Sequence, residues 1–387
     1  MAELEDKLIE DLKSGKDVSL ERALLIVSGC RTEEEIAGYV EKLNQIQQEF
    51  REHYQINEKA KDPVAHKAKM LFDYLWETKP DRSNTNSLLT DVIDAQLSEY
   101  KHEKIGDCVG LTSLYTVMGL REELNLSILV SDKHTLNRLR TDYDIYDIDN
   151  RHPLGFDFHS GFDYQLENFK ERFVMDIVPL VLNNRGLIRH KLGDFKAALN
   201  DYNKAIELYP YYSFIYNNRG NAKRKLRKKK SALVDYDKAI ELNPKNSAAY
   251  SNRGISKSEL GDKEGAIKDC DRAIELNPKN SEVYSNRGIV KSESGDDEGA
   301  IEDYDRAIEL DPEYSAAYYN RGISKWKTGD YEGALNDYDK VIEINPKEYT
   351  AYISKYFVKI ELFIHNLAKN MNPATLVRKA IEYYKEK

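Results

Sequence analysis

The sequence predicts two structural parts, a superhelix of repeated α-helical hairpins and, before it, a separate α+β domain. Residues 1–178 pass from apolar spacing typical of helices to short stretches of alternation typical of strands, and they show no long-range period. The length of 387 residues also exceeds what one hydrophobic core usually organises. The strongest indication of repeats is a set of five prolines spaced 34 residues apart: Pro210, Pro244, Pro278, Pro312 and Pro346.

Composition and charge exclude several classes of protein. The apolar fraction of 41% is large enough to bury a core, so the chain is expected to fold. The formal charge of −9 disfavours binding along the phosphate backbone of a nucleic acid. No apolar run approaches the roughly 18–20 residues that cross a bilayer. Because residues 1–7 are acidic where a signal peptide would be basic, a cytoplasmic location is expected.

Cysteine usage and short motifs predict neither a disulfide framework nor a cofactor. The three cysteines, Cys30, Cys108 and Cys270, are odd in number and widely spaced, so each is expected to be a free thiol. No paired-cysteine zinc site or other metal site is predicted. The sequence also carries no glycine-rich phosphate loop and no dinucleotide fingerprint. We therefore expect no metal and no cofactor.

The first part of the chain divides into a helical region, residues 1–63, and an α+β domain with a linker, residues 64–178. Apolar spacing predicts helices at about residues 20–29, 33–52, 64–77 and 86–99. Strands are predicted at 127–130, from residue 134 to about 139, and at 143–149.

Cys108 is the most informative residue of this domain. It follows Gly106-Asp107 and begins an amphipathic helix. A thiol at that position meets the positive end of the helix dipole, which lowers its pKa and favours the thiolate. The alternative is that Cys108 is a packed structural thiol, the role we expect for Cys30.

The order of a cysteine at a helix start, then His134, then Asp149 resembles the transglutaminase-like branch of the papain-like thiol enzymes, over roughly residues 64–150. The resemblance implies that Cys108 is the nucleophile, His134 the base and Asp149 the group that orients the imidazole. Asp147 is an alternative to Asp149, because strand alternation alone cannot choose between them. Three further residues are candidates, His152 and His159 as rival bases and Gln96 as an oxyanion donor.

The second part of the chain is a series of five repeats, at residues 179–212, 213–246, 247–280, 281–314 and 315–348. Glycine recurs at the eighth place of each repeat and alanine at the twentieth, where small residues let two helices approach closely. Gly-Asp at places fifteen and sixteen, as in Gly261-Asp262, ends one helix and caps the next. With tyrosine at the fourth place of four repeats, the pattern resembles the tetratricopeptide repeat. That resemblance implies a superhelix whose groove binds a protein or peptide.

Three polar columns run through the repeats. Asparagine at the sixth place is predicted either to bind the backbone of a peptide or to tie neighbouring helices together. Arginine at the seventh place and aspartate at the twenty-third are predicted to form a ladder of ion pairs, the alternative being two solvated stripes. The asparagine column consists of Asn184, Asn218, Asn252, Asn286 and Asn320.

Two segments depart from the regular repeats. A basic run at residues 223–230 replaces the Gly-Asp turn of the second repeat, and we expect a solvated local patch there rather than a nucleic-acid site. Residues 349–387 are predicted to be a degenerate sixth repeat with capping helices, one of them starting at Asn372-Pro373. The function expected from the whole chain is peptide binding coupled to thiol chemistry on an amide. The alternative is a non-enzymatic adaptor.

Overall fold

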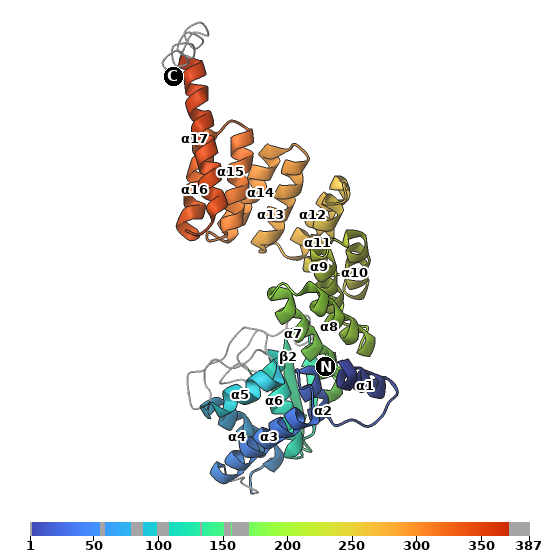
Figure 1. Cartoon of the computed structure of the whole chain (residues 1–387). Helices are drawn as coiled ribbons and strands as arrows, with labels where there is room; N and C mark the ends of the chain where they lie inside the picture. Colours follow the sequence, from blue (N-terminus) through green and yellow to red (C-terminus); the bar gives the residue numbers. More distant parts are fainter. Residues whose placement is uncertain are drawn as a thin grey trace. The chain divides into compact units, whose positions relative to one another are not determined.

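The structure, a computed structural model, describes residues 2–54, 59–78, 88–98, 108–131, 134–150, 156 and 170–370. The chain divides into two compact units, an N-terminal unit of residues 1–228 and a C-terminal unit of residues 229–387. Figure 1 colours the chain along its sequence, so the first unit runs from blue to green and the second from green to red. His152, His159 and the predicted helix start at Asn372-Pro373 lie outside the described residues.

The N-terminal unit begins with six helices, and side-chain caps explain where two of them start. The Ser19 side chain accepts a hydrogen bond from the N–H of Arg22, and Thr32 does the same for Glu35. All four predicted helices are present within a few residues, whereas α1 is an addition to them. The six are α1 (Ala2–Lys13), α2 (Leu20–Val27), α3 (Glu33–His53), α4 (Pro63–Thr78), α5 (Leu89–Leu97) and α6 (Cys108–Arg121).

A small antiparallel sheet follows α6, in the strand order β3-β2-β1-β4. Its strands are β1 (Leu126–Val130), β2 (Thr135–Arg140), β3 (Ile145–Ile148) and β4 (Lys170–Arg172). The three predicted strands correspond to β1, β2 and β3, and β4 is an addition. Residues 109–119 of α6 are buried on every side of the helix, because α4, α5 and the sheet all contact it. This central helix is the element that positions the predicted thiol.

The first repeat helices complete the same N-terminal core. A short 3₁₀ helix, η3 (Val174–Asp176), leads into α7 (Ile177–Lys191), α8 (Phe195–Leu208) and α9 (Ser213–Lys225). Buried apolar residues from α1 through α9 form one continuous cluster, which includes Leu24, Leu114 and Leu180. The start of the repeats at residue 179 is therefore a change in sequence pattern without a break in packing.

The C-terminal unit is all helical over its described residues, and Figure 1 shows its helices from α10 to α17. Among the helices that the structure describes, none is both long and apolar enough to span a membrane. The helices of this unit are α10 (Lys229–Leu242), α11 (Ser247–Ser258), α12 (Lys263–Leu276), α13 (Ser281–Glu293), α14 (Asp297–Leu310), α15 (Ser315–Lys327), α16 (Tyr331–Ile344) and α17 (Tyr349–Asn370).

The turn inside four of the five repeats works as the Gly-Asp pair predicts. Gly261 has a φ of +93°, which L side chains rarely adopt, and Asp262 then accepts a hydrogen bond from the N–H of Gly265 at 2.9 Å. The second repeat has Arg227 at this place, and the residue adopts a φ of 60° despite its side chain. The same glycine and cap recur in the first, fourth and fifth repeats at Gly193-Asp194, Gly295-Asp296 and Gly329-Asp330.

Close approach between the two helices of a repeat explains the glycine at the eighth place. A Cβ added to Gly288 would lie 2.7 Å from Cε1 of Tyr304. In the third repeat Cys270 takes the place of this tyrosine and is fully buried against Gly254. Cys270 therefore packs as a small apolar residue inside its repeat.

Candidate functional site

Cys108 is the first residue of α6, so its backbone lies at the end of the helix where the N–H groups of the first turn point outward. The helix dipole places partial positive charge at this end. The side chain of Cys108 itself lies outside the part of the chain that the structure describes. What the structure does describe is the path of α6 along β2.

Two hydrogen bonds fix how α6 runs beside β2. The Thr112 hydroxyl donates to the carbonyl of Thr135 at 3.2 Å, and the side chain of Asn137 donates to the Thr116 hydroxyl at 2.7 Å. Four helical residues, rising about 6 Å, thus match two strand residues, rising about 6.6 Å. Cys108 lies one further turn back along α6. His134 is the residue that immediately precedes β2.

The structure brings His134 and Asp149 together. Nε2 of His134 lies 3.2 Å from Oδ2 of Asp149, and both side chains are almost completely buried. The antiparallel pairing of β2 with β3 explains the contact, because Asn137 is opposite Ile148 and the start of β2 therefore lies beside the end of β3. A histidine that precedes β2 and an aspartate that follows β3 must consequently be neighbours.

Asp147, the alternative to Asp149, has a different partner. Arg138 forks onto it, with Nε at 2.6 Å and Nη2 at 2.8 Å from the two carboxylate oxygens. Arg138 also donates to Glu171 on β4 at 3.2 Å. Because β3 ends at Ile148, strand alternation does not extend to Asp149. The two aspartates therefore differ in role, and Asp149 is the one beside the imidazole.

Sequence reasoning missed a buried amide bridge next to this pair. Asn150 donates to the side-chain oxygen of Asn137 at 2.7 Å, and Asn137 in turn donates to Thr116 on α6. The bridge ties the segment after β3 to the helix that begins at Cys108. In the sequence, the only indication of this amide bridge is that Asn150 directly follows Asp149.

The other residues considered for chemistry have structural surroundings. Burial raises the pKa of the Cys30 thiol to about 11 and that of Cys270 to about 12. Gln96 is buried on α5, a helix that packs against α6. Within the described ranges, no group of three or more His, Cys, Asp or Glu side chains is arranged to hold a metal ion.

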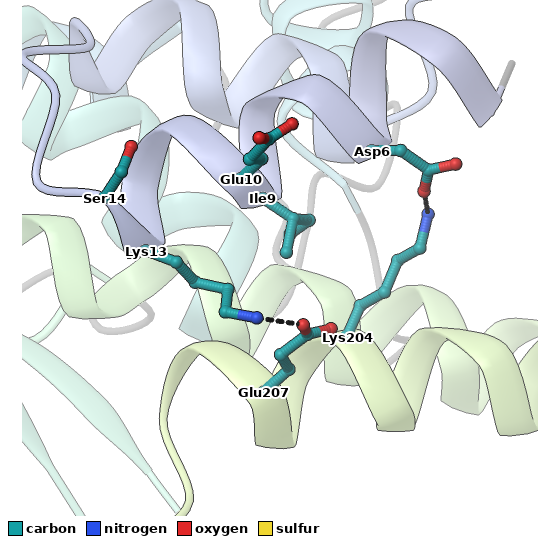
Figure 2. A pocket seen from close by; sticks show the side chains of 7 residues that line it. All are labelled: Asp6, Ile9, Glu10, Lys13, Ser14, Lys204 and Glu207. Carbon is teal, nitrogen blue, oxygen red and sulfur yellow. Dashed lines mark hydrogen bonds and ion pairs between the residues drawn. The ribbon is translucent and has the colours of Figure 1, made fainter.

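A hollow of about 450 Å³ lies between α1 and α8, and Figure 2 shows the seven side chains that line it. Two ion pairs cross it, from Lys204 to Asp6 at 2.6 Å and from Lys13 to Glu207. None of the predicted catalytic residues lines this hollow. The ion pairs connect the first helix of the chain to the first repeat.

The predicted Arg–Asp pairs are observed in the first, third, fourth and fifth repeats. In the third repeat Arg253 donates from Nε and Nη2 to the two oxygens of Asp269, at 2.8 and 2.6 Å. The aspartate is buried and also contacts Lys257 at 2.8 Å. The same fork joins Arg287 to Asp303 and Arg321 to Asp337, and Arg185 binds one oxygen of Asp201.

Each ladder arginine of the C-terminal unit also reaches back to the preceding repeat, a contact that the sequence pattern does not predict. Nη1 of Arg253 donates at 2.8 Å to Asp237, the aspartate at the twenty-fifth place of the second repeat. The guanidinium lies over the Tyr250 ring, 5.4 Å from its centre. Equivalent bonds run from Arg287 to Asp271 and from Arg321 to Asp305. One arginine therefore holds its own hairpin together and fixes it to the hairpin before.

The asparagine column ties neighbouring helices at two places. Asn218 donates to Asn183 at 2.9 Å, and Asn286 donates to Ser251 at 3.1 Å, each time reaching the fifth place of the preceding repeat. Asn184 is buried, whereas Asn252 and Asn320 are half-buried. Contacts between helices, one of the two predicted roles, are thus observed. Peptide binding by the column stays a prediction.

Comparison with protein families identifies the repeats. The tetratricopeptide repeat family matches residues 179–212, 213–246, 247–280 and 315–348. Two further matches to tetratricopeptide repeats cover residues 270–302 and 290–329. Residues 179–348 are therefore tetratricopeptide repeats, as the sequence pattern predicted. None of these matches covers residues 1–178, so the transglutaminase-like resemblance stays a prediction.

Several solved structures are similar to part of this chain. MamA is 25% identical, with 43% of this chain and 96% of that chain covered and a TM-score of 0.37. YrrB, described as a repeat protein with an unusual peptide-binding site, is 25% identical over 46% of this chain and 92% of its own, with a TM-score of 0.36. A repeat protein of Thermus thermophilus, TTC0263, is 19% identical, with 47% and 99% covered and a TM-score of 0.43. No curated protein matches the chain.

Proposed function

Because residues 179–348 are tetratricopeptide repeats, we propose that this chain binds a protein or peptide through them and carries in its N-terminal unit a thiol site that acts on an amide. Helical repeats of this type expose long surfaces that suit an extended partner. The amides of Asn252 and Asn320 are half-buried on the first helices of their repeats, where an amide can both donate to and accept from a peptide backbone.

The observations that support the thiol site are the 3.2 Å contact between His134 and Asp149 and the hydrogen bond from Thr112, one turn after Cys108, to Thr135, the neighbour of His134. In the proposed reaction the Cys108 thiol passes its proton to Nδ1 of His134. Asp149, on Nε2, holds the ring in place and stabilises the imidazolium that forms. The helix dipole of α6 favours the thiolate.

The bonds made and broken follow from these roles. The thiolate attacks the carbonyl carbon of an amide, and the amine leaves with the proton held by the imidazolium, so that a thioester forms on Cys108. Water then attacks the thioester with the imidazole as base, the C–S bond breaks, and the imidazolium returns the proton to the Cys108 sulfur, which completes hydrolysis or deamidation. An amine in place of water would give a cross-link. Water is the default acceptor in this proposal.

Alkylation of the full chain by iodoacetamide between pH 5 and 9 tests the thiol site. We expect Cys108 to react near pH 6 at least about tenfold faster than an ordinary thiol, whose pKa is about 8.5. Cys30 and Cys270 serve as slow internal controls, since burial raises their pKa to about 11 and about 12. Cys108→Ser removes the fast adduct, and an ordinary pH profile at Cys108 would exclude the proposed chemistry.

The two aspartates supply matched variants for the same measurement. Asp149→Asn is expected to slow alkylation of Cys108 and shift its pH profile, because the imidazole loses its carboxylate. Asp147→Asn is expected to leave that profile unchanged and to destabilise the sheet, because it breaks the fork from Arg138. Equal profiles for the two variants would contradict the role given to Asp149.

A non-enzymatic adaptor is the second candidate, favoured by the fact that the family matches cover only the repeats. Affinity capture with Cys108→Ala, followed by binding measurements on the captured protein, tests the repeat surface. We expect the double variant Asn252→Ala, Asn320→Ala to weaken binding, and Asn336→Ala on the second helix of the fifth repeat to leave it unchanged. If the double variant bound the partner as tightly as the native chain, the asparagine column would not be the docking surface.

A further inference from the structure

The last helix of the C-terminal unit, α17, carries an apolar face that faces solvent among the described residues. Eight large apolar side chains of this helix are between 38% and 74% exposed. At 100° per residue all eight fall within one sector of about 140°, so they form a single stripe along the helix. We call this stripe the outward face, and it consists of Tyr349, Tyr352, Ile353, Tyr356, Phe357, Ile360, Phe363 and Ile364.

The opposite side of α17 is already packed. Ala351 and Val358 on that side are buried, and the helix contacts α16. At its edges Lys355 binds Asp339, and Glu361 accepts a hydrogen bond from the indole of Trp326 at 2.7 Å. The helix is thus fixed to the fifth repeat by one face, while the outward face points away from it.

A repeat hairpin cannot cover the outward face in the usual way. In the fourth repeat the second helix packs closely because the eighth place is Gly288, where even a Cβ would lie 2.7 Å from the Tyr304 ring. The eighth place of the sixth repeat is Tyr356, whose side chain is 66% exposed. Its ring occupies the space that the second helix of a hairpin would need. In addition α17 has 22 residues where α16 has 14, and Figure 1 shows it continuing past the other helices of its unit.

The size and composition of the outward face match one side of a stable protein interface. At roughly 150–250 Å² for a whole aromatic side chain, the exposed fractions correspond to an apolar area of roughly 900 Å². The largest apolar patch on a typical monomer is about 300–600 Å², whereas one partner in a standard interface buries about 800 Å². No charged residue lies within the stripe. A face that is apolar throughout matches homodimer interfaces, which are more apolar than those of transient complexes.

We propose that the outward face of α17 is a homodimer interface, in which the α17 helices of two copies of this chain pack against each other. A helix stripe is self-complementary, since a two-fold axis brings the same side chains from both copies together. The stripe mixes rings with branched isoleucines, so the side chains of one helix can fit between those of the other. Dimerisation removes the apolar face from water without requiring a different protein.

The mass of the full chain, measured by sedimentation equilibrium and light scattering over a range of concentrations, tests the proposal. We expect a dimer for the native sequence. Phe357→Glu and Phe363→Glu are each expected to raise the dissociation constant of the dimer at least about 30-fold. Each substitution places two charges in the interface, one from each copy of the chain. Because both side chains are more than 60% exposed, circular dichroism should show the same helix content as the native chain.

Val234→Glu is the matched control. Val234 is a large apolar residue on α10 that is 65% exposed and lies outside the outward face, so this variant should remain a dimer. A native chain that is monomeric throughout the concentration range would overturn the proposal, including the case in which residues 371–387 cover the face. A dimer that neither phenylalanine variant weakens would overturn it as well.

Discussion

Substituting Arg253 and Asp269 separately and together measures how much the Arg–Asp ladder stabilises the repeats. Arg253→Met keeps an apolar stem of similar length and removes the guanidinium, together with its contact over the Tyr250 ring. Asp269→Ala removes the acceptor. Each single variant leaves part of the network, because Asp269 retains Lys257 and Arg253 retains Asp237. The double variant removes both Arg253 and Asp269, so neither side chain of this ion pair is left without the other.

The expected magnitudes follow from burial and bond number. Breaking a buried ion pair costs about 3–5 kcal/mol, but the Arg253 side chain is 19% exposed and Asp269 7% exposed, so water relieves part of the loss. We therefore expect each single variant to cost about 2–3 kcal/mol. The double variant should cost about 3–4 kcal/mol, less than the two singles combined, which gives a coupling energy of about 1.5 kcal/mol.

Hydrogen exchange of the amides in α11 and α12 is the suitable assay, because repeats open locally and a single unfolding midpoint would average over both units. The opening free energies of these amides in the native chain, the two single variants and the double variant together give the double-mutant cycle, and hence the coupling energy. Glu275→Ala serves as control, since its ion pair with Arg272 is exposed on the same hairpin, and protection should not change. Additive single variants, with a coupling below about 0.5 kcal/mol, would show that the ladder is only a solvated stripe.

Three further predictions test local features. Arg227→Gly should raise the protection of α9 by about 1 kcal/mol, since Arg227 holds a φ of 60° where other repeats have glycine. Gly288→Ala should lower the protection of α13 and α14 by about 1–3 kcal/mol, because its Cβ would meet the Tyr304 ring. Hydrogen bonding by Arg140 lowers the pKa of Glu171 to about 2 from its usual 4.5. Glu171 therefore stabilises the N-terminal unit above about pH 4.5 and loses this contribution toward pH 2, and in acid titrations Glu171→Gln should flatten that loss.

Much of the fold was predictable because its signals are local or periodic. Apolar spacing located α2 to α5, and the alternation after residue 126 located three strands. The ladder could be predicted because an arginine and an aspartate recur at fixed places of every repeat. The second bond of each arginine, such as Arg253 to Asp237, depends on how one hairpin sits against the next, which a column of residues does not specify.

The candidate site was harder to predict because it depends on where strands end. Asp147 and Asp149 could be separated only once β3 was seen to stop at Ile148 and Arg138 was seen to hold Asp147. The Asn137–Asn150 bridge joins two segments whose proximity follows from the antiparallel pairing. Sequence order thus singled out His134 and the two aspartates, while strand register decided which aspartate lies beside His134.

The helix that follows the fifth repeat, α17, shows how one departure from the repeat pattern can leave a helix face open. Lys355 takes the ladder place of arginine and keeps the bond to the preceding repeat through Asp339, so α17 docks as the first helix of a hairpin would. Tyr356 then replaces the glycine that admits a second helix. With that helix kept away, the side that would have been the interior of a hairpin becomes the outward face. A change at one place of the repeat therefore converts an internal packing surface into one that a second copy can cover.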